Sequence, residues 1–124
     1  MKKLLLIIAM APLLLATQCN EDDNGIACTE EARAGLNITI KDAETNLYLS
    51  EGVSVIATDG SYSEALISFD VVEPIFSGAY EREGNYIITV SKSGYVTYTS
   101  EIITVTSDVC HVIPQQITIL LKQE

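Results

Sequence analysis

Residues 36–41 read Leu-Asn-Ile-Thr-Ile-Lys, and this alternation of apolar and polar side chains decides the fold class. Successive side chains of a β-strand point to opposite faces, so Leu36, Ile38 and Ile40 share one buried face. The same alternation returns along the chain at Val53, Val55 and Ala57, at Tyr86, Ile88 and Val90, and at Ile117, Ile119 and Leu121. No stretch after residue 20 combines helical periodicity with good helix formers over three turns. The pattern predicts an all-β domain.

Turn signals separate these strands. Asp and Asn within residues 42–46 favour a turn, because their side chains bond the nearby backbone. Asp59-Gly60 favours a tight hairpin, since glycine adopts positive φ without strain. Lys92-Ser93-Gly94 marks a third turn.

The remaining segments complete the predicted sandwich. Residues 62–69 are expected to form one strand, and 95–100 and 102–106 two more. Residues 70–77 are expected to be irregular, because Pro74 cannot donate a hydrogen bond within a central strand. About seven strands at this spacing are typical of a β-sandwich, and a chain of 124 residues has room for one such domain.

The acidic composition limits the possible partners. The chain has a formal charge of −10, and beyond Lys2 and Lys3 it carries five Lys or Arg against 17 Asp or Glu. Such a surface repels nucleic acid and anionic lipid headgroups, so nucleic-acid binding is excluded.

The N-terminus has the pattern of an export leader. Lys2 and Lys3 precede an apolar run over 4–15, which is too short to span a bilayer comfortably but suits a signal peptide. The following Leu-Ala-Thr-Gln-Cys, residues 15–19, resembles the lipobox of bacterial lipoproteins, in which the cysteine is lipidated and becomes the first residue. We therefore expect a signal peptide over 1–18 and lipidation of Cys19.

One detail leaves an alternative open, and a second counts against that alternative. The residue before a lipidated cysteine is usually small, and here it is Gln18. Ordinary signal-peptidase cleavage, giving a plain secreted protein, needs small residues at two positions before the cut. The only Ala-x-Ala pattern near the leader's end, residues 9–11, falls inside the apolar core.

The segment 19–27 is expected to be an acidic, solvated tether. Its Glu21, Asp22 and Asp23 resemble the surface-export signal of Bacteroidota lipoproteins, and a simple spacer is the alternative. Adjacent carboxylates on such a segment do not preorganise a metal site. The resemblance implies an outer-membrane lipoprotein exposed at the cell surface; a periplasm-facing or secreted protein remains the alternative.

Three further elements carry a resemblance to a domain family. They are Ala34 to Thr45, the run Gly78-Ala79-Tyr80-Glu81-Arg82-Glu83-Gly84-Asn85-Tyr86, and Lys92-Ser93-Gly94-Tyr95. Residues 28–124 resemble the carboxypeptidase regulatory-like domain, and Cys110-His111-Val112 resembles an exported bacterial subset of it. The resemblance implies a prealbumin-like (transthyretin-like) Greek-key sandwich of about seven strands. It implies no activity, because a fold alone does not determine function.

Cysteine arithmetic assigns the remaining thiols. With Cys19 lipidated, Cys28 and Cys110 form an even pair in an exported chain, which favours a disulfide. Closing a loop of about 80 residues would stabilise the fold by roughly 4 kcal/mol in the chain-entropy model. A free reactive or metal-binding pair is the alternative.

Few other residues are candidates for a site. His111 is the only histidine, so it cannot build a typical zinc site; we expect a packing or hydrogen-bonding role beside the disulfide, with ligand binding as the alternative. No Gly-x-Ser-x-Gly motif is present, no second histidine could complete a triad, and no cofactor is expected. The Glu81-Arg82-Glu83 cluster is expected to be a solvated turn.

The tyrosines are the last candidates. Tyr86 is in phase with the buried face of its strand and is expected in the core. Tyr95 and Tyr98 are expected on opposite faces of one strand, where an exposed ring would suit glycan or protein contacts. A stabilising cross-strand pair is the alternative.

These features predict a lipid-anchored, non-catalytic module that binds an unknown protein or glycan partner, with the membrane contacted through the lipid. A periplasm-facing inhibitor or chaperone-like lipoprotein is one alternative. A hydrolase accessory or an enzyme of unrecognised type is the other.

Overall fold

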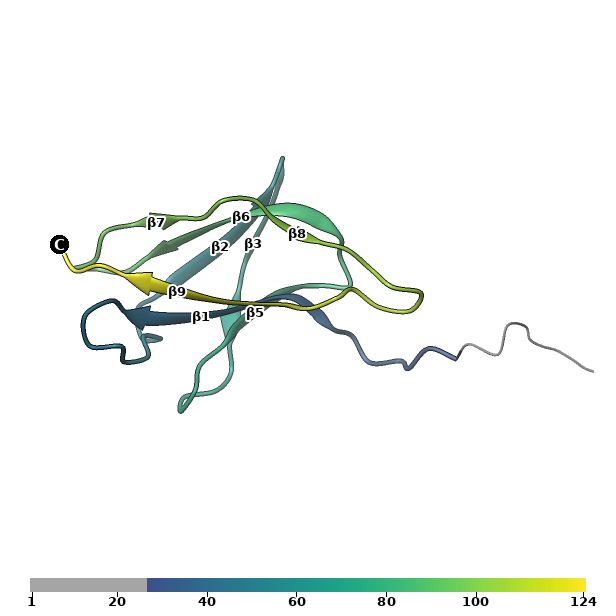
Figure 1. The fold of residues 1–124 in the computed structure, drawn as a ribbon, viewed down its shortest axis with the longest axis horizontal. Coiled ribbons are helices and arrows are strands. Elements are labelled where there is room, and N and C mark those ends of the chain that lie inside the picture. The colour runs from purple at the N-terminus through teal and green to yellow at the C-terminus, as the bar shows by residue number, and fades with distance from the viewer. Residues whose placement is uncertain (1–26) are drawn as a thin grey trace, which may run out of the picture.

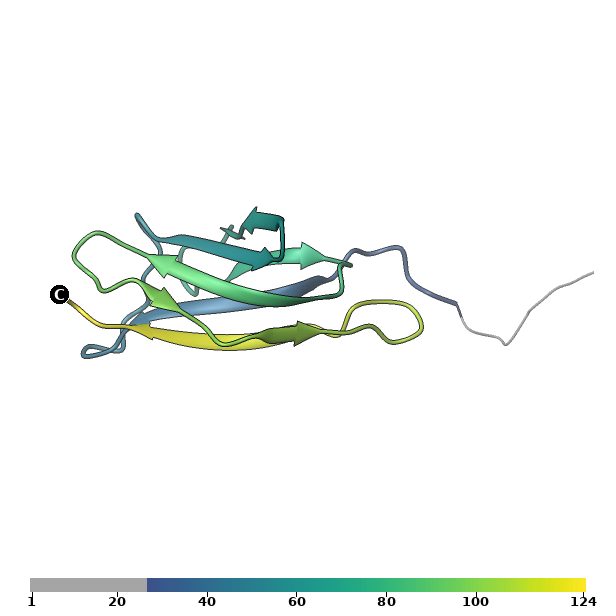
Figure 2. The same ribbon diagram turned by 90° about the horizontal axis from the view of Figure 1, so that it is seen from above.

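The computed structural model describes residues 27–124, which fold as two β-sheets packed face to face (Figures 1 and 2). Among these residues every regular element is a strand, so the all-β prediction is confirmed. The strands are β1 (Ala34–Asp42), β2 (Ser54–Asp59), β3 (Tyr62–Ala65), β4 (Ile67–Ser68), β5 (Phe76–Tyr80), β6 (Gly84–Ser91), β7 (Tyr98–Thr99), β8 (Ile103–Val105) and β9 (Gln115–Leu121).

The first and last strands lie side by side in the first sheet, whose order is β4-β5-β1-β9. β9 pairs with β1 in parallel, with Ile117 beside Ile38 and Ile119 beside Ile40. All other pairings between strands are antiparallel. The second sheet has the order β3-β2-β6-β7, and β8 also pairs with β6.

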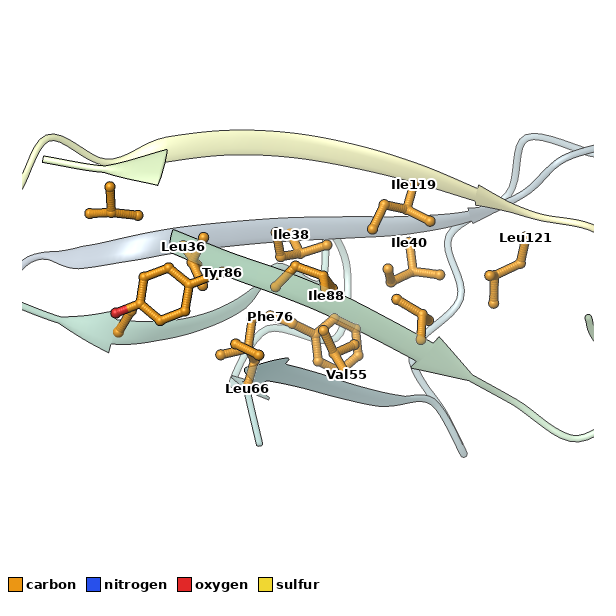
Figure 3. Close-up of a cluster of buried hydrophobic side chains, with 14 of the residues drawn as sticks. Leu36, Ile38, Ile40, Val55, Leu66, Phe76, Tyr86, Ile88, Ile119 and Leu121 are labelled. Carbon is orange, nitrogen blue, oxygen red and sulfur yellow. The ribbon is translucent and has the colours of Figure 1, made fainter. Parts of the chain in front are cut away.

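The core is the layer of apolar side chains between the sheets (Figure 3). The predicted inward residues of β1 are all fully buried, and Tyr86 is buried as expected. From the two sheets together, the largest fully buried apolar side chains are Leu36, Ile38, Ile40, Val55, Tyr86, Ile88, Val90, Val105, Val112, Ile119 and Leu121.

The chain changes sheets within the predicted strand 62–69, so that prediction is wrong in part. Leu66 separates β3, in the second sheet, from β4, in the first. Its side chain is buried between the sheets, and its N–H donates to the carbonyl of Val55 at 2.8 Å. A side chain on Gly78 would collide with Leu66, so glycine is required where β5 passes this corner.

Two further departures concern the edges of the sandwich. The sequence predicted irregular chain over residues 70–77, but β5 already begins at Phe76. Pro74 is buried just before that strand. Of the predicted strand 95–100, only Tyr98–Thr99 is a strand, and Tyr95 makes an isolated bridge to Gln123. Short segments such as these depend on tertiary pairing more than on local pattern. The described residues therefore form nine short strands, where the spacing predicted about seven.

Asp42, at the end of β1, is a buried carboxylate without a cation in contact among the described residues. Its Oδ2 accepts from the Tyr95 hydroxyl at 2.7 Å and from Gln123 Nε2 at 2.8 Å. Its Oδ1 accepts the backbone N–H groups of Glu44 at 2.7 Å and Thr45 at 2.9 Å, which builds the predicted 42–46 turn. These bonds, those from Gln123 and Tyr95 first, hold the pKa of Asp42 far below its usual range.

We predict that Asp42→Asn destabilises the domain more than Glu44→Gln, which removes the same charge from an exposed position of the same turn. A folded-state pKa below the unfolded value of about 4 stabilises the fold above that pH, and the effect is lost as pH falls toward the folded pKa. The difference in unfolding free energy between wild type and Asp42→Asn should therefore shrink when urea titrations at pH 7 are repeated near pH 3. A constant difference would contradict the prediction.

Candidate functional site

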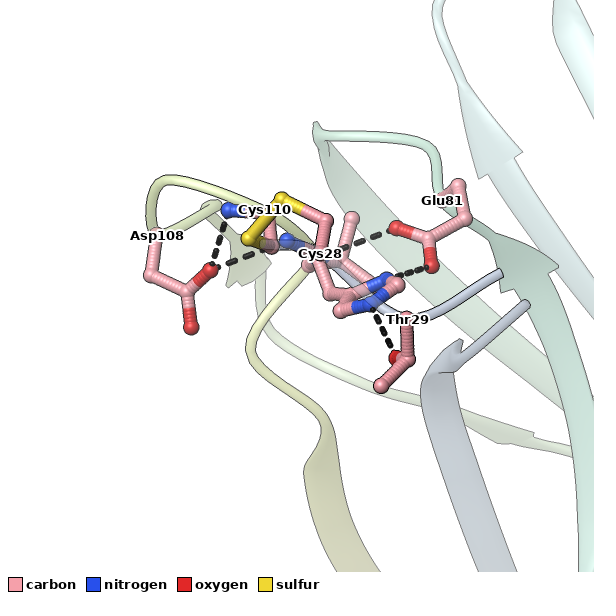
Figure 4. The surroundings of a disulfide bond; sticks show 7 residues. Cys28, Thr29, Glu81, Asp108 and Cys110 are labelled. Atoms are coloured by element: carbon pink, nitrogen blue, oxygen red, sulfur yellow. Dashed lines mark hydrogen bonds and ion pairs between the residues drawn. A yellow bond between two sulfur atoms is a disulfide. The ribbon is translucent and has the colours of Figure 1, made fainter. Parts of the chain in front are cut away.

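A disulfide joins the N-terminal segment of the domain to a distant loop. Cys28 and Cys110 are bonded, with their Cα atoms 5.3 Å apart across a sequence separation of 82 residues (Figure 4). Cys28 lies before β1 and Cys110 lies in the loop between β8 and β9. The bond therefore connects the N-terminal segment to the loop that precedes the final strand.

The loop around Cys110 is shaped by one carboxylate. Asp108 Oδ1 accepts the N–H groups of His111 at 2.9 Å and Cys110 at 2.8 Å, and these two bonds lower the pKa of Asp108. The Asp108 N–H in turn donates to the carbonyl of His111 at 2.9 Å. The result is a closed turn that fixes the direction of the His111 side chain.

Glu81 reaches this loop from the end of β5. Ala79 and Glu81 both have left-handed backbone, with φ of 55° and 51°, on either side of Tyr80. Such conformations are costly for residues with a side chain and persist only where surrounding contacts hold them. Here Glu81 Oε1 accepts the Val112 N–H at 3.0 Å, and Oε2 accepts the Arg33 N–H at 3.0 Å.

His111 lies between that carboxylate and a hydroxyl. Its side chain is buried, its Nδ1 is 2.5 Å from Glu81 Oε2, and its Nε2 is 2.9 Å from the Thr29 Oγ1. The bond from His111 is the main reason that the pKa of Glu81 is lowered, so Glu81 is ionised and only accepts. Nδ1 therefore carries hydrogen, and in neutral His111 the Nε2 atom accepts from Thr29. The three side chains form a hydroxyl–imidazole–carboxylate row.

Two shallow hollows flank the row. One of about 510 Å³ is lined by Glu30, Glu31, Glu81, Asp108 and His111 among others. The second, of about 370 Å³, is lined by Thr29, Arg33 and His111 among others. No three His, Cys, Asp or Glu side chains within residues 27–124 are grouped to hold a metal ion.

The Glu81-Arg82-Glu83 cluster is more than the solvated turn that the sequence suggested. Arg82 donates to the Tyr86 hydroxyl at 2.9 Å and to Asp59 at 3.1 Å, and its guanidinium lies 3.6 Å from the centre of the Tyr62 ring. Sequence reasoning missed Glu81 and Thr29 as partners of His111. The only local sign of a role for Glu81 was the charge cluster before Gly84. That cluster does not indicate which loop the Glu81 carboxylate contacts.

The two candidate tyrosines have different surroundings. Tyr95 is half-buried, and the hydroxyl that a ligand would need donates to Asp42. Tyr98 is exposed and lines a hollow of about 180 Å³ with Val96 and Leu120. Of the two, Tyr98 has the ring that a ligand could cover.

The other predicted site residues, Cys19 and the run Glu21, Asp22 and Asp23, lie outside the described residues, as does the leader. Within residues 27–124 no helix is long and apolar enough to cross a membrane. No protein-family model matches this sequence, and its comparison with curated proteins finds no match.

We predict that breaking the disulfide lowers the melting temperature of the domain without changing its fold. A loss of about 2–3 kcal/mol would lower the melting temperature by about 10 °C. Cys28→Ala, Cys110→Ala and the double variant should melt together, because each removes the same link. Thiol titration of the unreduced protein is the direct check: two reactive thiols in the native domain would contradict the disulfide.

Proposed function

We propose that the protein is a lipid-anchored, non-catalytic module with a prealbumin-like Greek-key sandwich, held at the outer membrane and exposed at the cell surface, where it binds a protein or glycan partner. The leader that ends at Cys19 supports the anchor, and the acidic run after it supports export to the surface. The two-sheet architecture is consistent with the finer fold proposed.

The observation that carries this proposal is the position of the disulfide relative to Cys19. Cys28 follows Cys19 by nine residues, which span at most about 30 Å when extended. The disulfide thus secures the domain at the point where the tether enters it. A domain restrained at this point resists fraying of its N-terminal segment, which suits a domain joined to its anchor by a short tether.

The buried polar groups support a non-catalytic role. Asp42, Glu81 and His111 each have their bonding capacity used by other groups of the same fold. Groups satisfied in this way stabilise the fold, and that role accounts for their burial without a substrate.

We predict that Cys19→Ser moves the protein from the membrane fraction to a soluble or unprocessed form. Changing Glu21, Asp22 and Asp23 to Ala should leave the protein in the membrane but reduce its digestion by protease added to intact cells. Glu30→Ala with Glu31→Ala is the matched control, and digestion of that variant should equal wild type. A wild-type N-terminus without acyl chains in mass spectrometry would refute the anchor, and equal digestion of all variants would reduce the acidic run to a spacer.

Hydrolysis is a second candidate function, favoured by one observation. Thr29, His111 and Glu81 stand in the order of a nucleophile, a general base and an orienting acid. In such a reaction Thr29 Oγ1 would attack an ester carbonyl and its proton would pass to His111 Nε2, while Glu81 stabilises the imidazolium. The ester C–O bond would then break as His111 returns that proton to the leaving alcohol, and a water molecule activated by the same imidazole would release the acyl group from Thr29 as the acid. The same contacts also serve to fasten the N-terminal segment to the loop, and that role needs no substrate.

We predict that wild type and Thr29→Val, which has nearly the same shape, release p-nitrophenol from p-nitrophenyl acetate at the same rate. A wild-type rate that drops at least tenfold in both Thr29→Val and Glu81→Gln, with both variants folded by circular dichroism, would establish the hydrolase instead.

A further inference from the structure

The segment between β4 and β5 carries the two most exposed large apolar side chains of the described residues, Val71 and Phe69. Phe69, Val71 and Val72 are 84%, 89% and 75% exposed, and Ile67 and Ile75 beside them are also exposed. Figure 1 shows this hairpin projecting away from both sheets. Contiguous exposed apolar side chains on a soluble domain mark a surface that another molecule covers. We call residues 67–75 the apolar hairpin.

The apolar hairpin is held in shape by its own polar groups. Asp70 Oδ1 accepts the N–H groups of Val72 at 2.8 Å and Glu73 at 3.3 Å, and the Ser68 hydroxyl donates to the Asp70 carbonyl at 3.2 Å. Buried Pro74 secures the returning limb. The tip is therefore ordered before any partner arrives, which reduces the entropic cost of binding.

Charge narrows the choice of partner. Residues 42–81, which contain the apolar hairpin, hold eight Asp or Glu and no Lys, Arg or His. Two of those carboxylates, Asp70 and Glu73, flank the exposed valines. A second copy of this chain would bring like charges together, and a lipid surface would take both carboxylates out of water or against anionic headgroups. A basic protein surface has neither cost.

We propose that the apolar hairpin docks into an apolar cleft, rimmed by Lys and Arg, on a partner protein. Phe69, Val71 and Val72 fill the cleft, while Asp70 and Glu73 face its basic rim. The inference rests on the proposed function, since it assigns the partner-binding surface of the anchored module. It places that surface away from the hollow beside Tyr98.

Site-specific photo-crosslinking in membranes isolated from the producing cells tests this docking. Full-length protein carrying p-benzoylphenylalanine in place of Phe69 is irradiated in isolated membranes at about 50 mM and about 500 mM salt. The same replacement at Tyr98 is the positional control. We expect an adduct with one other protein at position 69, mapped to a peptide that contains Lys or Arg, with at least fivefold lower yield at high salt.

Matched substitutions distinguish a loss of partner contact from a loss of folding. Val71→Ser with Val72→Ser should reduce the adduct at position 69 at least fivefold, whereas Val109→Ser, at a position 76% exposed on another loop, should leave it unchanged. Unchanged melting temperatures show that the fold is intact in each variant, since the hairpin side chains lie outside the core.

The other outcomes overturn the docking proposal. An adduct with lipid, an adduct with a second copy, an adduct that salt does not affect, or no adduct at position 69 each contradicts it. An adduct at position 98 alone contradicts docking through the apolar hairpin but supports the proposal that the protein is a binding module. Loss of the protein from the membrane fraction would refute the anchor, and the docking would then be tested by the same irradiation of the soluble fraction.

Discussion

The parallel pairing of β1 with β9 is the interaction on which the rest of the structure depends. β1 is a central strand of the first sheet and supplies three of the largest buried side chains. A polar cluster closes each end of the pair: Asp42 with Tyr95 and Gln123 at one end, and Glu81 with His111 and the disulfide at the other. Each cluster joins the strand pair to segments distant in sequence. The polar groups therefore hold the two strands in register, and the apolar side chains between the clusters pack in the core.

The two polar clusters solve one problem in the same way. A buried or half-buried carboxylate needs hydrogen-bond donors in place of water, and backbone N–H groups supply many of them in both. Asp42 takes two from its own turn, and Glu81 takes those of Arg33 and Val112. Because donors come from separate segments, the carboxylates act as connectors, and the chain needs no excess of cations to neutralise them.

Period-2 patterning was enough to predict the inward faces of β1, β2, β6 and β9, and the three turns, because these depend on neighbours in sequence. The change of sheet at Leu66 could not be predicted, since no Gly, Pro, Asn or Asp interrupts Tyr62–Ser68 and only the packing of Leu66 against Gly78 marks the break. Glu81 and Thr29 could not be assigned to His111 for a similar reason. The contact of these residues with His111 depends on left-handed backbone at Ala79 and Glu81 and on the path of the loop that carries His111. Neither feature can be predicted from the local sequence.

Side-by-side placement of the first and last strands also controls when the domain can form. A polypeptide emerges from a ribosome or a translocation channel with its N-terminus first, so β1 has no parallel neighbour until β9 has also emerged. Contacts between distant segments form slowly because the loop between them must be closed first. The core therefore cannot close before β9 has emerged, and until then the chain has no complete first sheet against which the second can pack.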